Sequence, residues 1–219
     1  MNTDADSSRG GPITFAMTLM IASLAVLFAA SLVGYWVTRS RAADGEVMVP
    51  TLLWFSTLAL IAAGVLLSLA TRRLHAGAAP GAYGLLRNAG LAAVVFLALQ
   101  VPALLQLLAA HPLQLEAGNP LVGFVFFLIL LHALHVVGGV IALGVILWRA
   151  RTRGLSADRD GAAMRQTGRY WHFLDIVWVV MFLVFLLGQL DATETSPSRH
   201  PAGTLTPTAL VERAAAAGA

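Results

Sequence analysis

Cysteine and lysine are both absent from this chain of 219 residues. Without cysteine, a disulfide framework, a zinc thiolate site and a thiolate-ligated iron–sulfur cluster are excluded. Charge of either sign is also scarce, because only 11% of the residues are charged, against about 25% in a soluble domain. This shortage excludes an ordinary soluble globular domain.

Long apolar stretches are abundant, and 58% of all residues are hydrophobic. A helix needs about 20 apolar residues to cross a bilayer. Five stretches meet or approach that length, so we expect an all-α, polytopic membrane protein built as a bundle of five transmembrane helices. The expected spans are residues 13–37, 49–70, 85–110, 120–148 and 170–188.

The remaining segments are polar. Residues 1–12 lack the layout of a cleaved signal peptide and are expected to be disordered. Residues 149–169 are expected to form a loop between the last two spans. The transmembrane domain would then cover 13–190, and 191–219, rich in Ser, Thr, Pro and Ala, would form a flexible tail.

The distribution of arginine predicts how the bundle is oriented. All 14 basic residues are arginine, and six of them lie within 149–169. A cytoplasmic N-terminus places ten of the 14 on the cytoplasmic side, as the positive-inside rule requires. We therefore expect a multi-pass protein of the inner (plasma) membrane with its C-terminus outside. The arginines lie between spans and form no soluble basic face, so nucleic-acid binding is not expected.

One acidic residue, Asp175, lies inside the last apolar stretch. An ionisable group in hydrocarbon is costly, so it should face protein and have a partner. Tyr170, Trp171 and His172 precede Asp175, and Trp178 follows it. His172 and Asp175 are three residues apart, which places them on one helical face and makes His172 a candidate partner.

A second group of residues lies in the preceding span. His132 and His135 share a helical face, and Gly138 and Gly139 follow one turn later. Small residues let two helix backbones approach closely. We therefore expect the Gly138–Gly139 notch to let the last helix close over Asp175. In the third span, Gln100 and Gln106 are expected to make hydrogen bonds between helices.

These two groups resemble cytochrome c oxidase subunit III. The run HALHVVGG at 132–139 is similar to the penultimate helix of that family, and YWHFLDIVW at 170–178 is similar to its last helix. The resemblance is strong over 119–185 and weaker but co-linear over 14–106. It implies the five-helix form of a subunit that carries no haem and no copper. Such a subunit flanks a haem-containing catalytic subunit and other subunits, holds lipids such as phospholipid, and supports assembly, oxygen access and turnover stability in aerobic electron transport.

One position departs from the family pattern. Leu24 stands where the family usually has a buried glutamate, and leucine cannot hold a proton. The related alternatives are therefore an accessory membrane subunit of a nitric oxide reductase and a subunit of a quinol oxidase. The sequence leaves open which partner, and hence which electron donor, applies.

The sequence also allows interpretations from other functional classes, namely a membrane metal-site protein and a transporter. His132, His135, His172 and Asp175 are competent ligands for zinc or iron and define a metal-site alternative. A transporter would need polar groups on several helices near the midplane, and the first two spans offer few. For Asp175 itself, a structural role in inter-helix hydrogen bonding and a proton-linked role both remain open.

The topology can be tested with reporter fusions. A reporter fused after Ser156 should score as cytoplasmic, and one fused after Ser198 should score as external. Any other pair of results would refute the predicted orientation.

Overall fold

The computed structural model describes residues 4–41, 51–110 and 120–195, and within these ranges the regular structure is entirely helical. The five helices are α1 Asp4–Arg41, α2 Leu52–His75, α3 Ala79–Ala110, α5 Pro120–Arg153 and α6 Ala157–Thr195. All five are long and apolar enough to cross a membrane. The predicted all-α membrane fold with five transmembrane helices is therefore confirmed.

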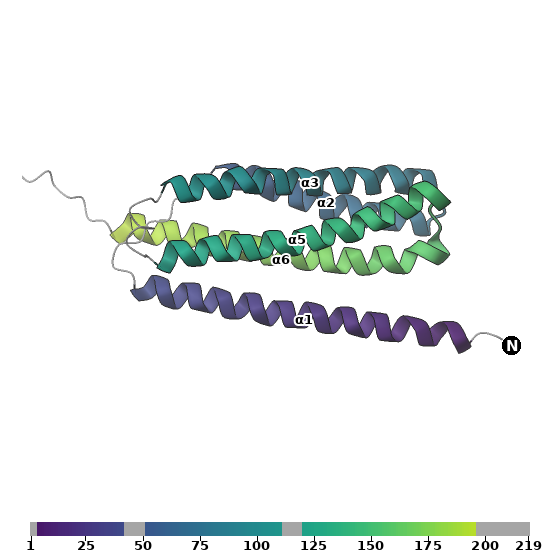
Figure 1. Ribbon diagram of the computed structural model, residues 1–219, viewed down its shortest axis with the longest axis horizontal. Helices are drawn as coiled ribbons and strands as arrows, with labels where there is room; N and C mark the ends of the chain where they lie inside the picture. Colours follow the sequence, from purple (N-terminus) through teal and green to yellow (C-terminus); the bar gives the residue numbers. More distant parts are fainter. Residues whose placement is uncertain (1–3, 42–50, 111–119, 196–219) are drawn as a thin grey trace, which may run out of the picture.

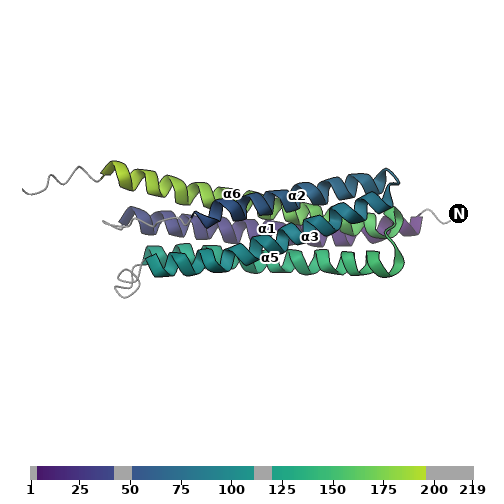
Figure 2. The same cartoon turned by 90° about the horizontal axis from the view of Figure 1, so that it is seen from above.

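The five helices run along one common axis (Figure 1; Figure 2). Successive helices alternate in direction, so α1 begins at one end of the bundle and α6 finishes at the other. Helices α2 and α3 pack most extensively against each other. Helix α6 contacts α1, α2 and α5, whereas α1 stands at the edge against α5 and α6. Helix α6 therefore connects α1, at the edge of the bundle, to α2 and α5.

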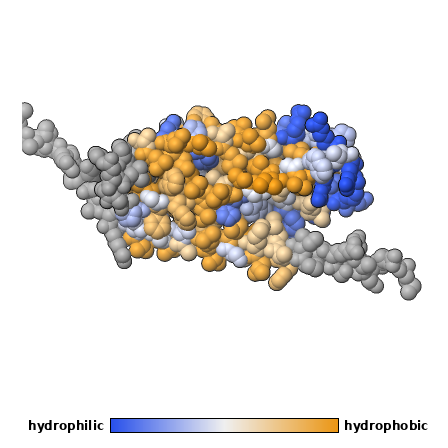
Figure 3. Space-filling model, viewed as in Figure 1, coloured by the Kyte–Doolittle hydropathy of each residue, from blue (hydrophilic) through white to orange (hydrophobic). Residues whose placement is uncertain are grey.

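The face of the bundle seen in Figure 3 is largely apolar along its middle. Large apolar side chains such as Val26 and Leu134 are 70% and 60% exposed, while Trp171 and Trp178 are almost fully buried. Hydrophilic residues gather at the end where α2 meets α3 and α5 meets α6. An apolar middle with a polar end is the pattern expected of a bundle whose solvent is lipid.

The predicted loop over 149–169 is wrong for most of its length. Helix α5 continues to Arg153 and α6 begins at Ala157, so the connection is only 154–156. Gly154 supplies a left-handed turn with φ of 69°. The Ser156 N–H then donates to the Asp160 carboxylate at 3.0 Å. Arginine-rich sequence can remain helical here because the helix satisfies its own backbone and the long side chains reach outward.

Helix α1 begins at Asp4, so residues 4–12 are helical although the sequence led us to expect disorder there. Once a long helix exists, each further residue adds one hydrogen bond at little extra cost, so the helix can extend beyond the apolar stretch. At the other end, α6 reaches Thr195. The predicted flexible tail lies otherwise outside the described residues.

Helices α5 and α6 approach closely at Gly139. A β-carbon placed on Gly139 would lie 2.8 Å from Cζ3 of Trp171 and 3.4 Å from Cε1 of Tyr170. Trp171 is fully buried, so its ring has no free space into which to retreat. The absence of a side chain at Gly139 therefore sets the distance between the two helices.

Replacing Gly139 with alanine should destabilise the bundle. We expect Gly139→Ala to cost about 1–3 kcal/mol, because the added methyl group overpacks a fixed ring. The matched control is Gly144→Ala in the same helix, where a β-carbon would meet nothing within 4 Å. That change should leave stability unchanged or raise it by up to about 1 kcal/mol through helix propensity. Thermal unfolding in detergent compares the two, and equal stability of both variants would contradict the close approach.

Candidate functional site

The residues singled out in α6 face two different neighbours. His172 and Asp175 lie toward α2, Tyr170 lies toward α5, and Trp178 contacts both α2 and α5. Trp171 reaches both, because its Cδ1 lies 3.3 Å from a β-carbon position on Gly64 of α2 while its Cζ3 meets Gly139 of α5. The indole therefore fills the space between two glycines on two different helices.

A row of polar contacts joins α6 to α2, and we call it the α2–α6 seam. Its three hydrogen bonds join Trp178 to Thr57, His172 to Ser68 and Arg165 to His75. The two helices are antiparallel, so the residue numbers rise along α2 as they fall along α6. The seam extends from the apolar middle of the bundle to its arginine-rich end.

The hydroxyl groups of the seam have defined roles. The Thr57 hydroxyl donates to the Leu53 carbonyl at 2.7 Å and accepts from the Trp178 indole N–H at 2.9 Å. The Ser68 hydroxyl donates to the Gly64 carbonyl at 3.0 Å. Because its one proton is used, Ser68 must accept from His172 Nε2–H at 2.7 Å. Serine and threonine thus satisfy their own helix and still hold α6.

The same reasoning assigns the tautomer of His75. Its Nδ1 lies 2.8 Å from the Thr71 carbonyl, which can only accept, so Nδ1 carries the proton. Nε2 is then free to accept from the Arg165 guanidinium at 2.6 Å. This contact closes the seam at the arginine-rich end.

Asp175 lies against Gly64 of α2. Its Oδ2 lies where a β-carbon of Gly64 would be, and 3.6 Å from Nδ1 of His172. The predicted proximity of His172 and Asp175 is therefore present, as a contact that is longer than a hydrogen bond and becomes an ion pair only when the imidazole is protonated. The other oxygen, Oδ1, is buried and has no hydrogen-bond partner among the described residues.

The prediction that Gly138 and Gly139 close over Asp175 is wrong. Gly139 receives Trp171, and a β-carbon placed on Gly138 would lie 3.8 Å from the Tyr170 hydroxyl. That hydroxyl donates to the His135 carbonyl at 3.0 Å. Asp175 lies five residues after Tyr170, which turns its side chain away from α5 and toward α2.

His132 is fully buried in a cage of aromatic rings, and we call this the His132 cage. Its ring centroid lies 5.0 Å from that of Trp178, 6.0 Å from Phe96 and 6.2 Å from Phe28. The cage therefore joins α1, α3, α5 and α6. Neither ring nitrogen of His132 has a hydrogen-bond partner among the described residues.

His135 lies one turn further along α5 and is only partly buried. Its Nδ1 donates to the Leu131 carbonyl at 2.7 Å, and its ring packs on Phe28 at 5.5 Å. Leu24, which stands at the family's carboxylate position, lies one turn before Phe28 and packs against the core. The α1 face that meets the two histidines is thus apolar.

The four residues of the metal-site alternative do not converge. His132 is enclosed by aromatic rings, whereas His172 and Asp175 face α2. In the parts of the chain that the structure describes, no three His, Cys, Asp or Glu side chains are grouped so as to hold a metal ion. The arrangement instead provides contacts between helices.

Sequence reasoning missed the α2 side of this arrangement. Thr57, Gly64 and Ser68 are spaced by seven and four residues, so these small or hydroxyl-bearing residues share one face of α2. This pattern is a usable signal for a helix that meets a polar partner in lipid. The aromatic partners Phe28 and Phe96 carry no such signal, because other phenylalanines of the chain, such as Phe55, are exposed on the outside of the bundle.

Comparison with known proteins matches the chain to a family. The family model described as cytochrome c oxidase subunit III matches residues 12–188. Subunit 3 of the cytochrome bo(3) ubiquinol oxidase of Pseudomonas aeruginosa is 28% identical over 196 residues, which cover 85% of this chain and 90% of that protein. The corresponding subunit of Pseudomonas putida is 30% identical over 61% of this chain and 64% of that protein.

A third relative aligns over a short region at higher identity. Cytochrome c oxidase subunit 3 of Synechocystis is 40% identical over 57 residues, which cover 26% of this chain and 24% of that protein. The family model spans all five helices, including α6 with its two sets of contacts. This chain therefore belongs to the cytochrome c oxidase subunit III family and acts as a subunit III of a respiratory terminal oxidase.

Proposed function

We propose that this chain is a non-catalytic subunit that flanks the haem-containing subunit of a terminal oxidase and stabilises it during turnover. The observation that carries the proposal is that residues 170–178 of α6 are used for contacts within this chain. Tyr170, Trp171, His172 and Trp178 contact side chains or backbone of α2 and α5 within this chain. Their chemistry is used to hold helices together, which suits a scaffold.

The chain itself carries no haem or copper in this proposal; both belong to the partner. Support comes from His132, the most deeply buried imidazole among the described residues, whose ring packs against the aromatic rings of Phe28, Phe96 and Trp178. The membrane-facing sides of α1, α3 and α5 carry exposed apolar side chains, which suit both lipid and a membrane partner. We place the arginine-rich end in the cytoplasm and the bundle in the inner membrane, on the positive-inside rule.

A quinol-oxidizing partner is the second candidate. It is favoured by the length of the match to the Pseudomonas aeruginosa ubiquinol oxidase subunit, which covers 85% of this chain. A cytochrome-c-oxidizing partner is favoured by the family model and by the Synechocystis relative. The haem types of the partner separate these two, and they also separate an oxidase from a nitric oxide reductase.

Gentle extraction of the tagged chain should recover a haem-containing membrane partner. The optical spectrum and metal content of the complex should show haem and copper in an oxidase. Haem with non-haem iron would indicate a nitric oxide reductase instead. After the partner is dissociated, elemental analysis of this chain should find no stoichiometric metal. A chain that is recovered only on its own, or a metal that is lost in His132→Ala, would refute the proposal.

Variants at Asp175 should separate a structural role from a proton-linked role. Asp175→Asn keeps the shape of the side chain and should assemble and turn over normally. Asp175→Leu should weaken assembly by about 1–3 kcal/mol, because His172 and the Gly64 face lose their polar neighbour. Subunit retention and oxygen consumption across pH measure both effects.

The control for these variants is Asp158, which is exposed at the start of α6. Asp158→Asn and Asp158→Leu should both assemble like the unaltered chain. An Asp175→Asn complex that assembles fully but turns over slowly, or with a shifted pH dependence, would contradict the structural role.

A further inference from the structure

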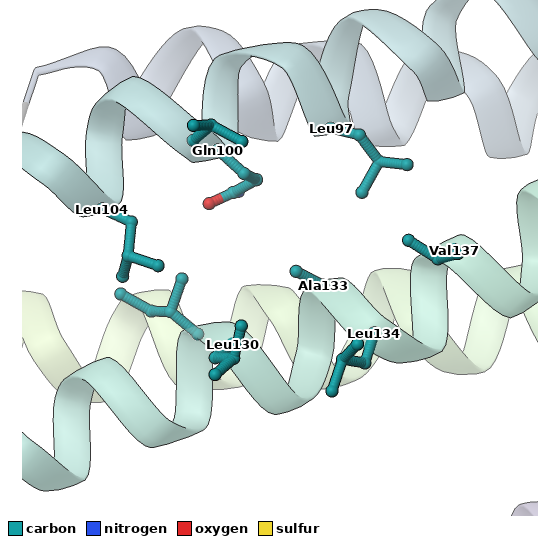
Figure 4. A pocket seen from close by; sticks show the side chains of 9 residues that line it. Leu97, Gln100, Leu104, Leu130, Ala133, Leu134 and Val137 are labelled. Carbon is teal, nitrogen blue, oxygen red and sulfur yellow. The ribbon is translucent and has the colours of Figure 1, made fainter.

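A groove on the membrane side of the bundle lies between α3 and α5 (Figure 4). Its volume is about 270 Å³, somewhat smaller than a pocket for a drug-sized molecule, which is roughly 300–1,000 Å³. Nearly all of its wall is apolar, formed by residues such as Leu97, Leu104, Ile129, Ala133 and Val137. Gln100 is the one polar residue in the lining.

The amide of Gln100 is held in one orientation. Its Nε2 lies 3.3 Å from the hydroxyl of Ser56, and that hydroxyl donates its only proton to the Leu53 carbonyl at 2.9 Å. Ser56 can therefore only accept, so Gln100 must present its NH₂ to Ser56 and its oxygen to the other side. This bond confirms the inter-helix hydrogen bond that the sequence predicted for Gln100.

The oxygen of Gln100 is a buried acceptor without a donor. The side chain is 4% exposed, and Oε1 has no hydrogen-bond partner among the described residues. Figure 4 shows this oxygen on the side of α3 that faces the groove. A carbonyl left unpaired in an apolar environment carries a free-energy penalty. A ligand that enters the groove with a hydrogen-bond donor would remove that penalty.

The groove lies within the hydrocarbon layer. At about 1.5 Å per residue, Gln100 is ~15 Å from the Ala110 end of α3, and Ala133 is ~20 Å from the Pro120 end of α5. Both helices are longer than the ~30 Å hydrocarbon core. Phospholipid head groups and other interfacial hydroxyls stay nearer the surface, and acyl chains, which reach this depth, have no donor.

We propose that the α3–α5 groove binds the hydroxylated ring of a membrane-dissolved hydroquinone, with one ring hydroxyl donating to Oε1 of Gln100. Such a molecule combines a flat apolar body of suitable size, a donor and free diffusion at this depth. The rim residues Val101 and Leu134 are 63% and 60% exposed, so the groove can be entered sideways from the lipid. The site lies outside the α2–α6 seam and the His132 cage and does not depend on which catalytic subunit is the partner.

The test uses the intact complex in lipid nanodiscs, held reduced and without oxygen. The probe is a dimethoxy-methyl hydroquinone with a photoreactive diazirine on its tail, and labelled peptides are mapped by mass spectrometry. Its dimethyl ether is the matched probe without a donor. We expect the hydroquinone to label α3 and α5 at the groove, and the ether to label them about fivefold less, the loss expected for one neutral hydrogen bond.

Variants of this chain complete the test. Gln100→Leu removes the acceptor and should reduce hydroquinone labelling to the level of the ether. Ala133→Phe fills the groove and should reduce labelling by both probes. The control Gln106→Leu changes an exposed glutamine of the same helix that does not line the groove and should label like the unaltered chain.

Two outcomes would overturn the proposal. Equal labelling by both probes, unchanged in Gln100→Leu, would mean that the groove accepts any hydrocarbon, including acyl chains. The absence of labelling, together with cross-linking of Leu134→Cys to the catalytic subunit, would mean that a partner helix occupies the groove. The second outcome would leave the proposed subunit function intact. If the chain is recovered without a partner, that function fails, and the same labelling is carried out on the isolated chain in nanodiscs.

Discussion

The indole of Trp171 lies between two glycines, and the packing of the bundle depends on that fit. Gly64 of α2 and Gly139 of α5 each lack the β-carbon that would meet the ring. One side chain therefore sets the spacing of α6 from both neighbours. Three of the five helices, α2, α5 and α6, therefore meet at this junction, and α6 also contacts α1.

A membrane bundle needs such a junction because burial of apolar surface drives little association in lipid. Close packing and polar contacts must supply the preference for one arrangement. The α2–α6 seam gives α6 a register along α2, through Thr57 in the apolar middle and His75 at the arginine-rich end. The His132 cage adds a second fixed point that also includes α1 and α3.

Asp175 fits the same account. Its carboxylate lies over Gly64, directly beside the Trp171 junction, and within contact distance of His172. A charged or hydrogen-bonding group placed there penalises any arrangement that exposes it to lipid. We infer that this residue selects the native packing of α6.

The sequence predicts the fold well and the site only in part. Hydropathy locates five helices because each must satisfy its own backbone in lipid. Hydropathy misplaces the helix ends that lie outside the membrane, as at 149–169, because a polar segment in water can be either helix or loop. The spacing of His172 and Asp175 correctly predicts that they are neighbours, since that relation lies within one helix.

Relations between helices were harder to predict. The sequence predicts Gly138 and Gly139 as the neighbours of Asp175, but its neighbour is Gly64, because α2 and α5 each have a glycine that packs against Trp171. To choose between the two glycines, one must know how α6 is rotated about its own axis. The apolar pattern of a lipid-facing helix does not encode that rotation. The sequence does not predict the groove beside Gln100 for the same reason, since the groove depends on how three helices are placed relative to one another.

The central claim is that Asp175 and Trp171 pack on Gly64 of α2, and a rescue experiment tests it most directly. Gly64→Ala should destabilise the bundle by about 1–3 kcal/mol through overpacking. In an Asp175→Ala background most of that loss should disappear, because the carboxylate no longer occupies the space. Gly139→Ala, which meets Trp171 and Tyr170, should not be rescued by Asp175→Ala. Thermal unfolding of the three single and two double variants supplies the coupling energies. Additive effects of Gly64→Ala and Asp175→Ala, or rescue of Gly139→Ala instead, would contradict the account.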